Sequence, residues 1–295
     1  MSQQSKSISL FAVISAMFLW AGSFIWSKLA FETYEPFTVL LFRLSIAGIS
    51  LLLIGKLFRA IQRIEKKDWK VFLLLSFFEP FLYFVGENLG LKLVSPTVAS
   101  IIISTIPLFL PFVGVFFLKE RIIRSNIIGV IISISGVLAI IVDRNFNVSA
   151  STIGILLLLL AVFAALGYTV ILKSLSDRYN PITIVTWQNI IASFAFLPFF
   201  LFFDFNNFKD VGIFQSNFVY ILLLAFLASN GAFLLYTYAI RYFGVSKIGI
   251  YTNLIPIFAM LLSYFIYNEQ IDTAKLLGVV LVILGLLISE KRWFK

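Results

Sequence analysis

The sequence predicts an all-α integral membrane protein with ten transmembrane helices, arranged as two inverted five-helix repeats. Three observations lead to this fold class. The composition is 61% hydrophobic and only 13% charged, ten apolar runs are long enough to cross a bilayer, and matching residues recur in the two halves of the chain. A soluble helical protein needs polar faces on its helices, and these runs have almost none.

The ten apolar runs are separated by short polar connections, so neighbouring helices should be antiparallel. They lie at 8–31, 37–58, 69–91, 95–118, 122–142, 151–174, 181–203, 217–241, 245–267 and 272–290. The first run continues into Lys28 without a small-residue cleavage site, so it is interpreted as a transmembrane helix and not as a signal peptide.

Basic residues predict the orientation. With the N-terminus inside, 17 of the 23 Lys and Arg residues fall on the cytoplasmic side, five fall outside, and Arg43 lies within a helix. Cytoplasmic loops carry this excess in membrane proteins. We therefore expect a multi-pass protein of the cell (cytoplasmic or inner) membrane with both termini in the cytoplasm. The same rule explains the net charge of +9 without nucleic acid.

One stretch of the chain occurs twice, at 104–120 and again at 253–269. In each copy a proline, Pro107 or Pro256, is expected in the middle of an apolar helix, and a glutamate, Glu120 or Glu269, follows the helix. An interior proline removes a backbone hydrogen bond and kinks a helix. The two prolines are therefore predicted to act as hinges around a central site.

The repeat extends over most of each half. One constant offset relates Gly22, Lys28, Tyr34 and Pro36 to Gly167, Lys173, Tyr179 and Pro181, and a slightly larger one relates Pro107, Glu120, Gly129 and Gly136 to Pro256, Glu269, Gly278 and Gly285. Because each half has an odd number of helices, the second half must begin on the opposite side of the membrane. The predicted units are 1–145 and 146–295.

Enzyme chemistry is not indicated. Neither Cys nor His is present, which removes disulfides, thiol nucleophiles and the commonest zinc ligands. No Gly-Lys-Ser/Thr phosphate loop occurs, so ATP-driven transport by this chain is not expected. We expect no cofactor and no metal.

Ionisable side chains deep in the apolar runs are functional candidates. Glu79 falls near the middle of the third run, and Tyr83 and Glu87 follow on the same face. Arg43 enters the second run close to the predicted depth of Glu87. Either Arg43 and Glu87 form a buried structural ion pair, or Arg43 binds a substrate carboxylate and Glu87 is its partner when the site is empty.

Glu79 has no basic residue at its own predicted depth, and burial disfavours a charged carboxylate. It could therefore carry a proton across the membrane, or it could be a protonated side chain bonded to a neighbouring helix. The repeat places Ala228 at the position of Glu79 and Tyr236 at that of Glu87. Any proton coupling would thus lie in the first half.

Neutral polar and aromatic residues complete the predicted substrate site, because small-molecule sites combine aromatic walls with a few polar groups. The candidates beside Arg43, Glu79, Tyr83 and Glu87 are Trp20, Ser23, Ser104, Tyr168, Trp187, Gln188, Asn230 and Asn253.

Two five-helix halves, each with a proline helix, a glutamate at its end and a Gly-rich last helix, resemble the EamA-type members of the drug/metabolite transporter superfamily. The resemblance covers nearly the whole chain. It implies a central cavity surrounded by the first four helices of each half, with the fifth and tenth helices at the periphery. It also implies export of amino acids, other metabolites or toxic compounds.

The preferred hypothesis is a secondary transporter that exports a small metabolite or amino acid by alternating access, as a monomer or weak homodimer in the lipid bilayer, with the proton as candidate coupling ion. An uncoupled facilitator of the same fold is one alternative. A lipid-handling membrane protein without solute transport is another.

Overall fold

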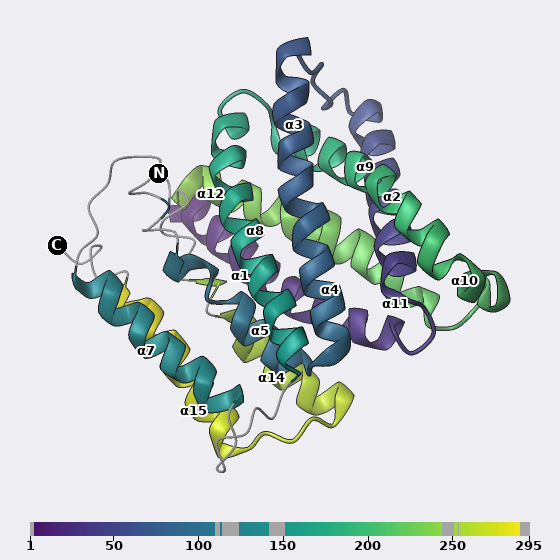
Figure 1. The fold of residues 1–295 in the computed structure, drawn as a ribbon. Helices are drawn as coiled ribbons and strands as arrows, with labels where there is room; N and C mark the ends of the chain where they lie inside the picture. The colour runs from purple at the N-terminus through teal and green to yellow at the C-terminus, as the bar shows by residue number, and fades with distance from the viewer. Residues whose placement is uncertain are drawn as a thin grey trace.

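The computed structural model describes residues 3–109, 113, 124–141, 151–243, 251–252 and 254–289, and every regular element in these ranges is a helix (Figure 1). Six of the helices are long and apolar enough to cross a membrane, and four further apolar helices are shorter. Together they occupy the ten predicted runs. The all-helical membrane fold is thereby confirmed, whereas the inverted repeat and the orientation stay predictions.

The first half contains α1 (Gln3–Ala30), α2 (Pro36–Leu57), η1 (Lys66–Asp68), α3 (Trp69–Ser76), the π-helical segment η2 (Phe77–Leu82), α4 (Tyr83–Leu93), α5 (Pro96–Ile103) and α7 (Arg124–Ile141). The second contains α8 (Thr152–Ser176), α9 (Pro181–Phe199), η3 (Phe200–Asp204), α10 (Phe205–Val211), α11 (Phe218–Leu223), the π-helical segment η4 (Leu224–Ala232), α12 (Phe233–Phe243), α14 (Leu254–Tyr267) and α15 (Thr273–Ser289). The seventh run thus continues to Val211, beyond its predicted end.

Local sequence explains where several helices begin. A proline is the first residue of α2, α5 and α9, a position where its missing N–H costs no helical hydrogen bond. The Asn180 side chain accepts a hydrogen bond from the amide of Thr183 at 2.8 Å and caps α9. Polar caps of this kind satisfy the free amides of a first turn.

The prediction of a proline in mid-helix is wrong for Pro107. Helix α5 ends at Ile103, a turn follows at Ser104 and Thr105, and Pro107 is the second residue of the helical turns that begin at Ile106. For Pro256 the position within its helix stays a prediction, because residues 251–252 before α14 are also helical and Asn253 lies outside the described residues. Because proline is tolerated in a first turn but not in a helix interior, the break at 104–105 precedes the proline.

Helices α4 and α8 pack closely through glycine. A Cβ on Gly86 would lie 2.4 Å from the carbonyl oxygen of Leu157 and 2.8 Å from the amide nitrogen of Ala161, both on α8. Small residues allow such backbone contact between membrane helices. The GxxxG spacing of Gly86 and Gly90 therefore marks a true helix–helix interface, because Gly90 also lies against α8.

Replacing Gly86 with alanine should destabilise the protein, because the added methyl group meets backbone atoms that cannot rotate away. We expect a loss of about 3 kcal/mol, at the upper end of overpacking costs. Thermal unfolding in detergent measures it. Gly231→Ala is the matched control, since its Cβ would meet atoms no closer than 3.3 Å. Equal melting temperatures for the two variants would contradict the close α4–α8 contact.

Helices α7 and α15 lie side by side at one edge of the molecule (Figure 1). A Cβ on Gly136 would lie 2.8 Å from the carbonyl oxygen of Gly278, and a Cβ on Gly285 would lie 2.5 Å from that of Gly129. These are the four glycines that the sequence repeat pairs with one another. The contact of Gly136 with Gly278 is therefore matched by the contact of Gly285 with Gly129, in which α7 and α15 exchange roles.

Candidate functional site

The third apolar run is interrupted at Glu79. This residue has extended backbone angles (φ −146°, ψ 123°) between helical neighbours, and the peptide bond to Pro80 is cis. The prediction of one continuous helix over 69–91 is therefore wrong. A proline disfavours helical angles in the residue before it, and Pro80 is the sequence feature that could have located the break.

The eighth run has an irregular segment at the matching place. Its π-helical segment, η4, spans Leu224–Ala232, and the repeat offset maps η2 into this range. Short π-helical insertions occur frequently at functional sites, and irregular backbone inside a membrane is tolerated where protein buries it or a cavity is lined by it. Because two such segments occupy equivalent positions, the region between them is the candidate functional site.

Arg43 of α2 extends into this region. Its Nε donates a hydrogen bond to Ser229 Oγ of η4 at 2.7 Å, and its guanidinium carbon lies 4.3 Å from the ring centroid of Phe84. The side chain is only 2% exposed, and its Nη1 has no acceptor among the described residues. An unpaired buried donor is costly, so this N–H group is a candidate to bind one more acceptor.

The buried ion pair between Arg43 and Glu87 is not formed. The four ion pairs among the described residues involve other groups. Glu87 instead accepts a hydrogen bond from Tyr83 at 3.0 Å and a longer one from Asn88 at 3.4 Å. Similar depth in two helices brought the two charged groups within electrostatic range but not into an ion pair.

Glu79 faces aromatic hydroxyl groups of the second half. Its carboxylate is within electrostatic range of Tyr168 and Tyr236, as well as of Arg43 and Glu87. Its exposed fraction is 9%, and it forms no hydrogen bond with another described residue. The hydrogen-bonded alternative predicted for Glu79 is thus not formed with a described residue.

Other predicted residues have most of their polar groups already engaged. Trp20 packs on Tyr236, with ring centroids 4.8 Å apart, and Tyr168 donates to Gln188 at 3.3 Å. Asn230 donates to Ser50 of α2 at 2.9 Å, while its Oδ1 is buried without a described partner. The hydroxyls of Ser23 and Ser104 bond to carbonyls of their own helical turns.

Trp187 packs against Trp69, with ring centroids 5.1 Å apart, and both contact the apolar cluster that contains Tyr168. Asn253 and Glu120 lie outside the described residues. We use the term central site for Arg43, Glu79, Glu87, Tyr168, Ser229 and Tyr236. Ser229 and Tyr236 were not predicted as site residues, although Tyr236 occupies the position in the second repeat that is equivalent to Glu87 in the first.

Two further clusters join the halves away from the central site. In the Asp68 cluster, the Asp68 carboxylate accepts from Arg178 Nη1 at 2.5 Å and from the Tyr179 hydroxyl at 2.7 Å. In the Asn217 cluster, the Asn217 amide donates to Thr33 Oγ1 at 2.9 Å. Beside it, Tyr34 donates to the carbonyl of Gly212 at 3.1 Å.

The two clusters correspond to each other in sequence. Thr33 and Tyr34 precede Arg178 and Tyr179 by the offset that relates Pro36 to Pro181, and Asp68 precedes Asn217 by the offset that relates Pro107 to Pro256. Each cluster joins the first connection of one half to the second connection of the other. The Asp68 cluster contains charged side chains, whereas the side chains of the Asn217 cluster are neutral.

Glu269 forms a third link between the halves. It accepts hydrogen bonds from Ser95 at 2.7 Å, Thr97 at 2.8 Å and Ser263 at 2.5 Å, and it pairs with Lys275 at 2.9 Å. Burial raises the pKa of this carboxyl, but these hydrogen bonds outweigh burial and hold the pKa below its ordinary value. A glutamate at the end of a helix can also accept hydrogen bonds from the free backbone amides of the next helix. Glu269 instead accepts from side chains at the start of α5.

Apolar helices of spanning length around a buried polar centre define a multi-pass membrane protein of the transporter type. The model of the EamA-like transporter family matches residues 7–142 and 152–290. The chain therefore belongs to the EamA-like transporter family, as the sequence resemblance predicted, and it is a membrane transporter.

Its relatives carry similar descriptions. The chain is 28% identical over 276 residues to an uncharacterized transporter of Archaeoglobus fulgidus, covering 92% of this chain and 95% of the relative. It is 29% identical to the uncharacterized transporter YdfC of Bacillus subtilis, covering 96% and 91%. One solved crystal structure matches with a TM-score of 0.72 at 17% identity, covering 98% of this chain and 99% of the other, which supports the fold alone.

Proposed function

We propose that the protein is a secondary-active exporter of amino acids in the cell (cytoplasmic or inner) membrane and that it works by alternating access. The observation that carries this proposal is the unpaired Nη1 of Arg43, buried between two irregular helical segments of opposite halves. A substrate carboxylate supplies the acceptor that the empty site lacks.

The neighbouring groups favour a zwitterion. A guanidinium binds a carboxylate through two parallel N–H donors, and Ser229 already holds Arg43 from the Nε side. Glu79 lies within electrostatic range of Arg43 and has tyrosines around it, so it offers a negative partner for a substrate ammonium group. Carboxylate on Arg43 and ammonium at Glu79 is the arrangement that an amino acid requires.

Proton coupling would use the same carboxylate. Among the charged groups of the central site, Glu79 has no hydrogen bond from a described residue, so a proton and a substrate ammonium group compete for it. Exchange of the two during the transport cycle would couple outward movement of substrate to inward movement of protons. Neutralising Glu79 then uncouples the protein.

Alternating access draws on the Asp68 and Asn217 clusters. Under the predicted orientation the Asp68 cluster lies at the cytoplasmic end and the Asn217 cluster at the external end. Equivalent links at opposite ends are what an inverted repeat offers for opening one side at a time. The breaks before Pro107 and at Glu79 provide positions where the helices can bend.

A ligand screen by thermal shift tests this function. Detergent-purified wild type, Glu79→Gln and the exposed control Asp210→Asn are compared with amino acids, nucleosides, sugars and cationic drugs. We expect amino acids alone to stabilise the wild type and the control, with a pH dependence that Glu79→Gln lacks. Stabilisation by cationic drugs only would contradict a carboxylate-binding site, and silence across the panel would favour a lipid-like substrate.

A further inference from the structure

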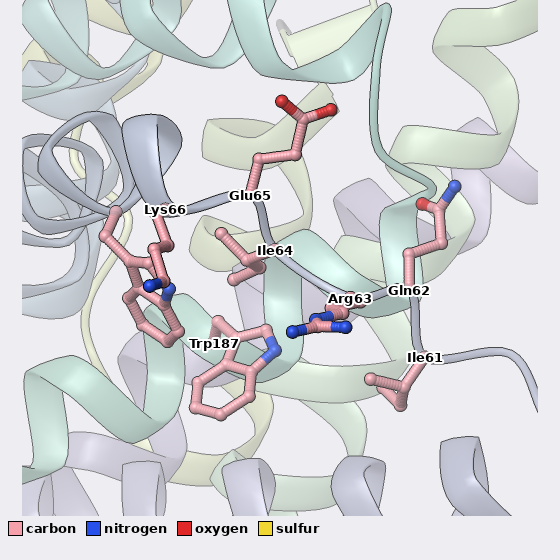
Figure 2. Close-up of a pocket in the computed structure, with 8 residues that line it drawn as sticks. Ile61, Gln62, Arg63, Ile64, Glu65, Lys66 and Trp187 are labelled. Carbon is pink, nitrogen blue, oxygen red and sulfur yellow. The ribbon is translucent and has the colours of Figure 1, made fainter.

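A cavity of about 720 Å³, lined by none of the central-site residues, lies beside the segment that joins α2 to α3. It is lined by Ile61, Gln62, Arg63, Ile64, Glu65, Lys66, Trp69 and Trp187. In Figure 2, Arg63 extends toward Trp187, whereas the Glu65 carboxylate points away from both. Under the predicted orientation this cavity lies at the cytoplasmic end of the protein.

The backbone that forms one wall of the cavity is fixed by the second half of the chain. The amide of Gln62 donates to Thr183 Oγ1 at 2.9 Å, and the amide of Glu65 donates to the Tyr179 hydroxyl at 3.1 Å. The Asn180 side chain donates to the carbonyl of Ala60 at 2.7 Å. The cavity is therefore preformed.

The free polar groups of the cavity are donors. Arg63 and Lys66 have no ion-pair partner among the described residues, and Trp187 Nε1 is buried without an acceptor there. The side-chain oxygen of Gln62, Oε1, already accepts a hydrogen bond from the backbone N–H of Asn180. Because Glu65 pairs with Lys67 at 2.8 Å, the cavity presents two uncompensated positive charges and an N–H group, which together suit an anion.

The surroundings place this anion site beside the lipid. Leu53, Leu57 and Phe58, at the end of α2 just before the cavity, are 63%, 77% and 74% exposed. Apolar side chains exposed at the end of a membrane helix face hydrocarbon, and Trp rings such as Trp69 and Trp187 are enriched where hydrocarbon meets headgroups. Basic pockets at this level recognise anionic headgroups.

We propose that this cavity binds the phosphate group of an anionic phospholipid from the adjoining leaflet. Arg63 and Lys66 neutralise the phosphate, Trp187 Nε1 donates to one of its oxygens, and the two indole rings contact the glycerol and the start of the acyl chains. The site is independent of the transported substrate. Free inorganic phosphate has the same charged oxygens as the lipid phosphate, so the experiment must distinguish these two ligands.

The experiment uses protein reconstituted in phosphatidylcholine vesicles that contain increasing mole fractions of brominated phosphatidylglycerol. Bromine quenches tryptophan fluorescence on contact, and Trp69 and Trp187 are the reporters at the cavity. We expect half-maximal quenching of the wild type at a mole fraction at least fivefold lower than with brominated phosphatidylcholine. Arg63→Gln combined with Lys66→Gln should abolish this preference.

Lys56→Gln combined with Lys70→Gln is the matched control, because it removes the same charge from exposed residues that do not line the cavity. Trp187→Phe keeps a ring and removes the N–H, so it should weaken the preference while the fold is retained. An unchanged preference in the Arg63/Lys66 variant would overturn the site. Equal half-maximal quenching of the wild type by the two brominated lipids, together with thermal stabilisation by millimolar inorganic phosphate, would overturn the lipid as its ligand.

Discussion

Linking either the Asp68 cluster or the Asn217 cluster covalently should reduce transport at least tenfold. Alternating access requires each end of the protein to open in turn, and each cluster joins the two halves at one end. A link at either end therefore stops the cycle, although it leaves the central site intact. The chain contains no cysteine, so introduced thiols are the only ones that react.

The measurement pairs Asp68→Cys with Arg178→Cys in one variant and Thr33→Cys with Asn217→Cys in another. A bismaleimide with a cleavable disulfide joins each pair in proteoliposomes, and transport is followed before cross-linking, after it and after reduction. Activity should fall and then return. Each single-cysteine variant receives the same treatment as a control. Full activity in a linked protein would show that its cluster does not separate during transport.

Arg43→Gln should weaken substrate binding more than 100-fold, which corresponds to about 2.8 kcal/mol. Removing one partner of a buried, charged hydrogen-bonded pair costs 2–5 kcal/mol or more. Arg43→Lys should be intermediate, because it keeps the charge but loses the planar pair of donors. Binding is measured by titration of the amino acid that the thermal-shift screen identifies.

A structural role for Arg43 makes a different prediction. If the guanidinium mainly held α2 to η4, Ser229→Ala would lower the melting temperature of the empty protein as much as Arg43→Gln does. We expect instead that both variants unfold within a few degrees of the wild type, since Arg43 Nη1 gains no partner in the empty site. Unchanged substrate affinity in Arg43→Gln would exclude it from the binding site.

The fold class could be predicted because it depends on composition. Ten long apolar runs leave no other arrangement that satisfies the backbone inside a bilayer. The break at Glu79 was also visible in the sequence as Pro80. The break at Ser104 and Thr105 was misplaced, because a proline identifies a nearby helix start as readily as a kink.

The contacts of the site could not be predicted in the same way. Depth along a helix says nothing about its rotation, so Arg43 reached Ser229 and not Glu87. Trp187 and Gln188 are neighbours in sequence but point about 100° apart on a helix with 3.6 residues per turn. One faces the cavity beside α3 and the other meets Tyr168. Such distinctions arise only when the helices are packed.

The paired glycines of α7 and α15 bear on how two copies of an ancestral unit can diverge. Gly129 and Gly136 meet Gly285 and Gly278, so a larger side chain in either copy collides with the other copy's backbone. Neither partner can change alone, and the pattern is still readable in both halves. Glu79 has no such constraint in the sequence, because the repeat places Ala228 at its position in the second half. If the two halves are repeats, as the sequence predicts, their glycine contacts have stayed alike while the ionisable residues have been kept in one half.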